Sequence, residues 1–93
     1  MIKRTVLISG AGRGVGLSVA TKLAAAGHRM LINDINQQTA EAAASAIIAN
    51  GGDAMAAPFD VSQTEAALSA IKDLQVEIGG IDVLINNAGN AGS

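Results

Sequence analysis

The feature that most constrains the fold is a glycine-rich turn placed directly between an apolar run and an alanine-rich run. The apolar run, residues 5–8, reads Thr-Val-Leu-Ile, and the turn at residues 9–16 reads Ser-Gly-Ala-Gly-Arg-Gly-Val-Gly. A short run of β-branched and aliphatic residues is typical of a strand buried on both faces of a parallel sheet. The alanine-rich run that follows predicts a helix from about Val15 to Ala26. The turn therefore joins a buried parallel strand to the helix that leaves it.

The remainder of the chain repeats this alternation of strand and helix. Further strands are expected at residues 29–33, 54–59 and 82–86, and further helices at residues 37–49 and from about residue 62 to residue 78. Strands that alternate with helices of this length predict a parallel sheet with right-handed crossovers. We therefore expect an α/β, Rossmann-like three-layer sandwich: a partial parallel sheet of four strands in the order 3-2-1-4, with three helices. The first two helices should cover one face and the third helix the other.

Three local details of the helices can be predicted as well. Val15, Val19 and Leu23 recur every four residues, with Ala20 and Ala24 beside them, so these residues should form one apolar stripe of the first helix. Asn36 is expected to cap the second helix. Residues 62–65 read Ser-Gln-Thr-Glu, which matches a capping box at the start of the third helix.

Composition limits the classes of function that the chain can have. The 93 residues allow one small domain, and a hydrophobic content of 49 % with 15 % charged residues predicts a packed core. A net charge of −2 is too weak to favour a nucleic-acid or membrane partner. The chain has no cysteine, and none of its residues has metal-ligand spacing. The apolar run behind Lys3 and Arg4 is too short for a signal segment or a membrane span, so a cytoplasmic protein is the default expectation.

The four glycines of the turn each suit a site that holds phosphates. Gly10 permits the sharp exit from the strand, and Gly14 lets the backbone approach a pyrophosphate. Gly16 lets the helix lie close to the sheet, and Gly12 is an additional glycine within the turn. The first amide groups of the helix and its dipole favour an anion. We interpret the turn as a cradle for the phosphates of a dinucleotide; the alternative is a tight turn without a ligand.

Two residues bear on which dinucleotide would bind. Asp34 lies at the end of the second strand, 24 residues after Gly10, where an acid can accept hydrogen bonds from an adenosine ribose. Its carboxylate would repel the 2′-phosphate of NADP, whereas Arg13 could pair with that phosphate. We favour NAD and leave NADP open through Arg13. The alternatives are a solvated or helix-capping role for Asp34 and a solvated loop position for Arg13.

Two further segments follow the third and fourth strands. Asp60 could accept a hydrogen bond from the adenine amino group while Val61 packs on the ring; Asp60 could equally just start the turn before the next helix. Residues 86–89 read Asn-Asn-Ala-Gly. Asparagine both donates and accepts hydrogen bonds, so it can tie strand ends together, and Ala88 and Gly89 leave space for a ring and a ribose. Taken alone, this segment is also an ordinary turn.

Taken together, these features resemble the short-chain dehydrogenase/reductase family. The family's glycine motif, Thr-Gly-x-x-x-Gly-x-Gly, is matched from Ser9 to Gly16, with Ser in place of Thr and Val15 in place of the common Ile. Its strand-end acid, its Asp-Val pair and its Asn-Asn-Ala-Gly segment follow in the same order. The resemblance covers the whole chain but only the first third or so of a typical member. The cofactor-binding residues that it implies are Ser9, Gly10, Gly12, Arg13, Gly14, Val15, Gly16, Asp34, Asp60, Val61, Asn87, Ala88 and Gly89.

The resemblance also implies an activity, which is hydride transfer between a nicotinamide and a carbonyl or alcohol. The family's catalytic Ser, Tyr and Lys follow the Asn-Asn-Ala-Gly segment, and this chain contains no tyrosine. We therefore assign no catalytic residue, and we interpret residues 1–93 as the truncated N-terminal part of an NAD(P)-binding domain. The alternatives are a non-catalytic dinucleotide-binding module or relic, and another Rossmann class such as a methyltransferase, against which residues 86–89 argue.

The resemblance and the fourth strand lead to an expectation about association. Full-length relatives are expected to be homo-oligomers. In this chain the fourth strand carries Val83, Leu84 and Ile85 at an open edge of the sheet. Open apolar edges pair with other chains. The chain alone is therefore expected to be marginally stable or self-associating.

Overall fold

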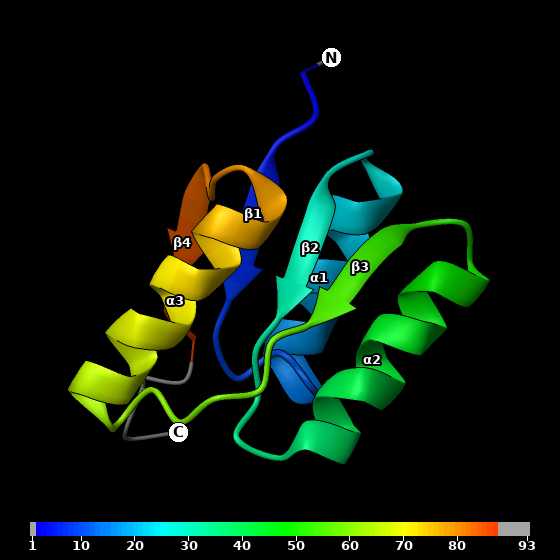
Figure 1. The fold of residues 1–93 in the computed structure, drawn as a ribbon. Coiled ribbons are helices and arrows are strands. Elements are labelled where there is room, and N and C mark those ends of the chain that lie inside the picture. The colour runs from blue at the N-terminus through cyan, green and yellow to red at the C-terminus, as the bar shows by residue number, and fades with distance from the viewer. Residues whose placement is uncertain (1, 88–93) are drawn as a thin grey trace.

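The computed structural model describes residues 2–87, in which strands and helices alternate along the chain (Figure 1). The strands are β1 (Thr5–Ile8), β2 (Arg29–Ile32), β3 (Asp53–Ala56) and β4 (Val83–Ile85). The helices are α1 (Gly14–Ala25), α2 (Gln37–Ala49) and α3 (Thr64–Ile78). All strand pairs are parallel and the order is β3-β2-β1-β4. The expected Rossmann-like α/β sandwich with strand order 3-2-1-4 is therefore confirmed.

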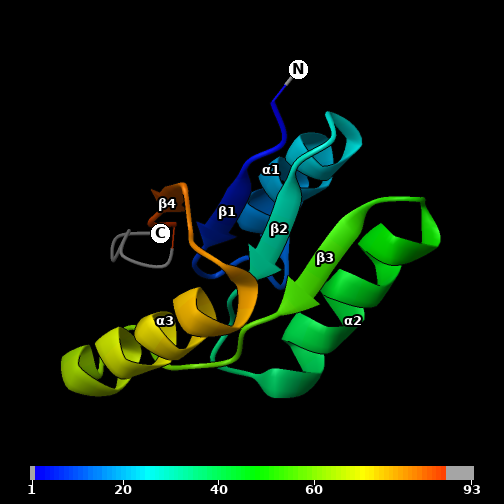
Figure 2. The same cartoon turned by 45° about the horizontal axis from the view of Figure 1, so that its top comes forward.

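The sheet separates two apolar cores. Figure 2 shows α1 and α2 on one face of the sheet and α3 on the other, as the sequence predicts. Alternate side chains of a strand point to opposite faces, so Ile8 and Ile32 pack toward α1 and α2 while Leu7 and Leu31 pack toward α3. The larger core also contains Ile47 of α2. Because β1 and β2 are buried on both faces, their sequences are almost continuously apolar.

The buried stripe of α1 agrees with the predicted one at Ala20 and Ala24 but not at Val15. Gly16, Ala20 and Ala24 are the buried residues of this helix, whereas the side chain of Val15 is 73 % exposed. Small residues on the inner face let α1 lie close to the sheet, so its larger apolar side chains lie at the flanks of the contact. The prediction that Val15 belongs to the core is wrong, although Val19 and Leu23 do pack against it.

The ends of the other two helices give one confirmed and one wrong prediction. The helix α2 has the predicted bounds, and Asn36 Oδ1 accepts a hydrogen bond from the Thr39 amide at 2.9 Å. The capping box does not form, because Ser62 Oγ donates to Asp60 Oδ1 at 2.6 Å. The helix α3 begins only at Thr64, after an N-cap residue, Gln63, that makes no side-chain capping bond.

The strands β2, β3 and β4 are shorter than predicted. The third strand ends at Ala56 rather than at Phe59, and Pro58 lies two residues beyond its end. Within residues 2–87 the fourth strand pairs with β1 alone, and Leu84 on it is 60 % exposed. None of the helices within residues 2–87 combines the length and the apolar character that crossing a membrane requires.

Candidate dinucleotide-binding site

The glycine-rich turn leaves β1 at the carboxyl edge of the sheet, the edge at which all parallel strands end. Gly10 and Gly14 have φ angles of +62° and +64°, which side-chain-bearing residues rarely adopt. Arg13 is the extended N-cap of α1, and its side chain makes no capping bond. The first turn of α1 holds no acidic residue. The helix therefore presents its amide groups and the positive end of its dipole to an anion rather than to its own side chains.

Gly16 is the point at which α1 contacts the turn. A Cβ atom at Gly16 would lie 2.6 Å from the backbone oxygen of Gly10 and 2.8 Å from Asn87 Nδ2. By contrast, a Cβ atom at Gly14 would meet no atom within 4 Å. The missing side chain at Gly16 thus allows α1 to contact the glycine turn closely. Gly14 faces open space where a ligand can approach. The close packing of helix and turn at Gly16 agrees with the sequence analysis, and the approach of a pyrophosphate at Gly14 stays a prediction.

Gly12 has a closer packing role than sequence reasoning gave it. A Cβ atom there would lie 2.5 Å from Thr39 Cγ2 and 2.7 Å from Asp34 Oδ2. The turn after β1 therefore rests directly on the end of β2 and the start of α2. The spacing of glycines alone could not identify this contact, since it joins segments more than 20 residues apart.

Asp34 and Arg13 occupy contrasting environments. Asp34 is only 7 % exposed, and its Oδ1 accepts a hydrogen bond from the Asn36 amide at 3.0 Å. Its other carboxylate oxygen lies beside Gly12. Arg13 is exposed, and among the residues that the structure describes it makes no ion pair. The structure therefore fixes the acid beside the glycine turn and leaves the guanidinium in solvent.

Asp60 and Val61 lie on the connection from β3 to α3. Asp60 Oδ1 accepts hydrogen bonds from the Ser62 amide at 2.9 Å and the Ser62 hydroxyl at 2.6 Å. The Ser62 hydroxyl and amide donors together lower the pKa of the Asp60 carboxyl below its ordinary value. This geometry is the turn-starting role that the sequence left open. Val61 is 37 % exposed and so presents apolar surface to solvent beside the carboxyl edge.

The end of β4 is tied to the end of β1. Asn87 Nδ2 donates to the Gly10 carbonyl at 3.2 Å, and Ser9 Oγ donates to Asn86 Oδ1 at 3.1 Å. The expectation that asparagines join strand ends here is confirmed for these two residues. Ala88 and Gly89 lie outside the described residues.

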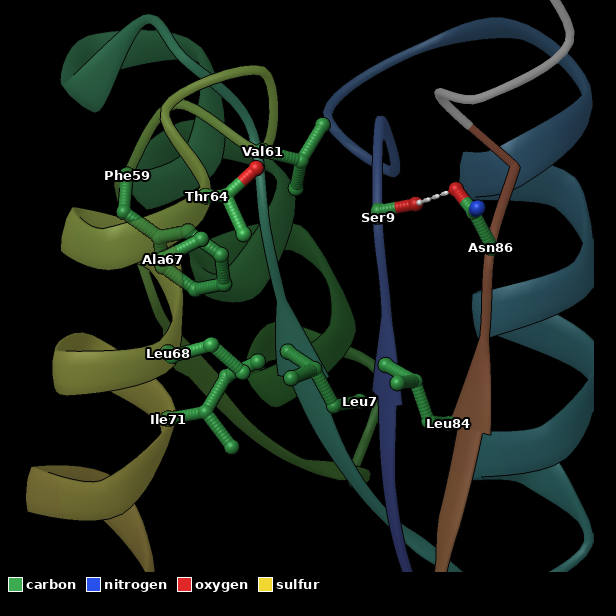
Figure 3. Close-up of a pocket in the computed structure, with 10 residues that line it drawn as sticks. All are labelled: Leu7, Ser9, Phe59, Val61, Thr64, Ala67, Leu68, Ile71, Leu84 and Asn86. Carbon is green, nitrogen blue, oxygen red and sulfur yellow. Dashed lines mark hydrogen bonds between the residues drawn. The ribbon is translucent and has the colours of Figure 1, made fainter.

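An apolar hollow of about 210 Å³ opens between α3 and the sheet (Figure 3). Side chains of α3, including Leu68 and Ile71, face Leu7 and Leu84 across it. Ser9 and Asn86 lie at its carboxyl-edge end. Among the described residues the lining contains no charged side chain, so the hollow differs in chemistry from the glycine turn.

Sequence reasoning missed Asn33, which it placed merely at the end of a strand. The residue is 1 % exposed, and its Nδ2 donates to the Ala57 carbonyl at 2.9 Å and the Phe59 carbonyl at 3.0 Å. Its Oδ1 accepts from the Gly10 amide at 3.4 Å. The sequence offers one weak signal, which is a polar residue that ends an apolar strand. Its burial depends on segments that meet only in the folded chain.

The described residues fit a dinucleotide better than a metal ion. Within residues 2–87 no three side chains of the metal-ligating types histidine, aspartate and glutamate gather closely enough to hold a metal. The glycine turn, in contrast, packs tightly against the protein at Gly12 and Gly16 and leaves open space at Gly14. It lies against an uncapped helix N-terminus and beside a buried acid.

Comparison with known proteins agrees with this geometry. The model of the family described as short chain dehydrogenase matches residues 4–93. The chain belongs to the short chain dehydrogenase family. Within this family, 5-keto-D-gluconate 5-reductase of Escherichia coli K12 is 40 % identical over 86 residues, which cover 92 % of this chain and 34 % of that protein. The 7alpha-hydroxysteroid dehydrogenase of the same strain is 37 % identical, covering 96 % of this chain and 35 % of that protein.

Solved structures of short chain dehydrogenases superpose well on this chain. A gluconate 5-dehydrogenase from Burkholderia cenocepacia, solved in complex with NADP and tartrate, has a TM-score of 0.88 and 40 % identity. The match covers 96 % of this chain and 35 % of that one. This chain therefore spans about a third of the length of the relatives that it matches, the third that contains the glycine turn.

Proposed function

We propose that residues 1–93 form the dinucleotide-binding part of an NAD(P)-dependent oxidoreductase, which transfers hydride between a nicotinamide and a carbonyl or alcohol. The observation that carries the proposal is the glycine turn, which pairs the two left-handed glycines Gly10 and Gly14 with the uncapped N-terminus of α1. Membership of the short chain dehydrogenase family supports the same chemistry. When bound, the nicotinamide would supply or accept the hydride, and this chain would hold and orient the dinucleotide.

The residues divide into roles along the dinucleotide. Gly14 and the first amides of α1 hold the diphosphate, with Gly10, Gly12 and Gly16 shaping the turn around it. Ser9 and Val15 flank the same turn. Asp34 accepts from the adenosine ribose, and Val61 with Asp60 borders the adenine. Asn87, Ala88 and Gly89 serve the nicotinamide end of the crevice.

We propose NAD as the preferred cofactor. The burial of Asp34 supports this choice, since a fixed carboxylate beside the ribose site repels a 2′-phosphate. Two unit charges about 4 Å apart at an effective dielectric constant near 20 interact by about 4 kcal/mol. Arg13, exposed on the turn, could offset part of this repulsion in NADP. The NADP in the Burkholderia structure belongs to that protein and leaves the choice in this chain to experiment.

Titration of the chain with NADH and with NADPH, followed by cofactor fluorescence, tests the proposal. We expect binding of both, with the tighter affinity for NADH. Binding of neither cofactor would overturn the dinucleotide site, and tighter binding of NADPH would reverse the assignment of Asp34 over Arg13. The variant Arg13→Ala should weaken NADPH binding more than NADH binding. Lys72→Ala, which removes an exposed charge on α3, is the matched control.

A second candidate function is a module that binds the dinucleotide without catalysis. Residues 1–93 contain no tyrosine to serve as the family's acid–base residue, so an oxidoreductase would need residues outside this segment. Translation of the coding DNA beyond residue 93 separates the two candidates. A downstream Tyr-x-x-x-Lys motif supports the oxidoreductase, and its absence from all reading frames supports the module.

A further inference from the structure

The connection from β3 to α3 leaves the sheet just after Ala57. The last ladder bond runs from the Ala57 amide to the Ile32 carbonyl at 2.8 Å. Pro58 follows and has no amide hydrogen to donate. The chain beyond it carries Asp60 and Val61, the residues proposed to border the adenine.

A single side chain replaces the missing ladder on both sides of this proline. The Asn33 amide nitrogen donates to the carbonyl before Pro58, that of Ala57, and to the carbonyl after it, that of Phe59. Both hydrogens of the amide are used, at 2.9 and 3.0 Å. An amide is suited to this place because it carries two donors and an acceptor without a charge.

The same residue is also bonded to the glycine turn. The Ala11 amide donates to the backbone carbonyl of Asn33 at 2.7 Å, and the Gly10 amide makes the longer bond to Asn33 Oδ1 at 3.4 Å. The backbone bond fixes the turn to the end of β2 whatever side chain stands at position 33. The Asn33 amide group then fixes the segment after β3 to that same point.

We infer that Asn33 is a positioning residue, which sets the distance between the glycine turn and the turn that carries Asp60 and Val61. This inference rests on the proposed function, in which the glycine turn holds the diphosphate and Asp60 and Val61 border the adenine of the same dinucleotide. Asn33 is too deeply buried to touch the ligand, so it acts through the segments that it holds. A ligand that spans both turns is bound well only when they are held at the correct separation before it arrives.

The variant Asn33→Ala removes both donors and tests the inference first without any ligand. Amide hydrogen exchange of residues 59–62 should accelerate about tenfold or more, while exchange in β1 and β2 changes less. Asn33→Ser keeps one donor and should give an intermediate rate; it also serves if the alanine variant fails to fold. Ile47→Val is the matched control, because it weakens the core far from this turn and should leave exchange of residues 59–62 within about twofold.

The second readout is the affinity of the same variants for NADH, measured by fluorescence. We expect about tenfold weaker binding by Asn33→Ala and a change of less than about twofold in Ile47→Val. Unchanged exchange at residues 59–62 in Asn33→Ala overturns the inference, and so does faster exchange with unchanged NADH affinity. If the unsubstituted chain binds no NADH, the proposed function fails instead, and the exchange rates still decide whether Asn33 holds the two turns together.

Discussion

The two edges of the sheet are held together by different kinds of polar contact. At the carboxyl edge, the side-chain contacts of Asn33 and Asn87 that join one strand end to another are uncharged and buried or part-buried: both residues donate amide hydrogens to backbone carbonyls. At the opposite, amino edge, they are charged and exposed. Lys3 Nζ and Arg29 Nε both lie near Asp53 Oδ2, at 2.7 and 3.1 Å, and all three side chains are 38–53 % exposed.

This difference separates a part of the molecule that fixes geometry from a part that adds a little stability. Buried hydrogen bonds are directional, and an unmade one leaves a costly orphan group. Exposed ion pairs are screened by solvent and salt, and a typical pair contributes less than about 1 kcal/mol. Precise geometry therefore lies where the parallel strands end, the place at which the proposed cofactor binds. We expect substitutions at the carboxyl edge to alter binding and those at the amino edge to alter stability alone.

The largest expected effect comes from Gly16→Ala. The added methyl group would overlap the Gly10 carbonyl, which is backbone and cannot move aside without opening the turn. We expect a loss of about 2 kcal/mol or more in the free energy of unfolding. NADH binding should also weaken by at least about tenfold. Urea unfolding and fluorescence titration measure the two quantities.

Gly14→Ala is the control that separates packing from ligand approach. Its methyl group would meet open space, so the stability loss should be limited to the cost of a left-handed alanine, about 1 kcal/mol. NADH affinity should nevertheless fall as much as in Gly16→Ala, because the methyl group occupies the approach to the diphosphate. Unchanged affinity in Gly14→Ala would contradict the placement of the ligand over this turn.

The next effect concerns the choice of cofactor. Asp34→Asn removes the negative charge beside the ribose site and keeps an oxygen for the Asn36 amide. We expect the ratio of NADPH to NADH affinity to rise by at least about tenfold, since charge repulsion of a few kcal/mol is removed. Asp73→Asn, an exposed change on α3, should leave the ratio unaltered. An unchanged ratio in Asp34→Asn would show that the carboxylate does not face the ribose.

A smaller effect is expected from Asn87→Ala. The variant removes the single bond from the Asn87 amide to Gly10, which contributes about 1 kcal/mol. NADH affinity should fall by about threefold, because the glycine turn loses its link to β4. The comparison variant is Asn50→Ala, which also removes a bond from a side-chain amide to a backbone carbonyl. Asn50 Nδ2 donates to the Ala46 carbonyl at 3.0 Å at the C-terminal end of α2. If Asn87→Ala and Asn50→Ala lost the same NADH affinity, the expected difference between the carboxyl and amino edges would be contradicted.

The sequence predicted those parts of the molecule that short-range patterns determine. The bounds of α2 follow from Asn36 before it and Gly51 after it. The glycine turn likewise indicates that a strand precedes it and a helix follows it. The third helix ends at Ile78 as predicted, but its predicted capping box was wrong because the Ser62 hydroxyl donates to Asp60, two residues before it. Sequence reasoning gave no role to Asn33, since its partners lie 23–26 residues away.

The smallest effect belongs to the amino edge. The hydrogen bond from Lys3, followed by the contact with Arg29, lowers the pKa of Asp53 below its ordinary value, against a weaker opposing effect of burial. A carboxyl group whose pKa is lower in the folded chain stabilises the fold above its unfolded pKa, near 4. That contribution disappears as the pH falls through the lower, folded value.

Asp53→Asn should therefore reduce the free energy of unfolding at pH 7 by about 0.5 kcal/mol, after allowance for the exposure of the pair. The difference in unfolding free energy from the unsubstituted chain should shrink below pH 4, where the Asp53 carboxyl becomes protonated. It should also shrink in 1 M salt, which screens the ion pairs. Urea unfolding midpoints at pH 7 and below pH 4 measure this difference. NADH affinity should not change, because the bonds that the Asp53 side chain makes within residues 2–87 go to Lys3 and Arg29 at the amino edge. A loss of affinity comparable to that of Asn87→Ala would mean that the two edges are coupled through the strands, and the contrast between them would then fail.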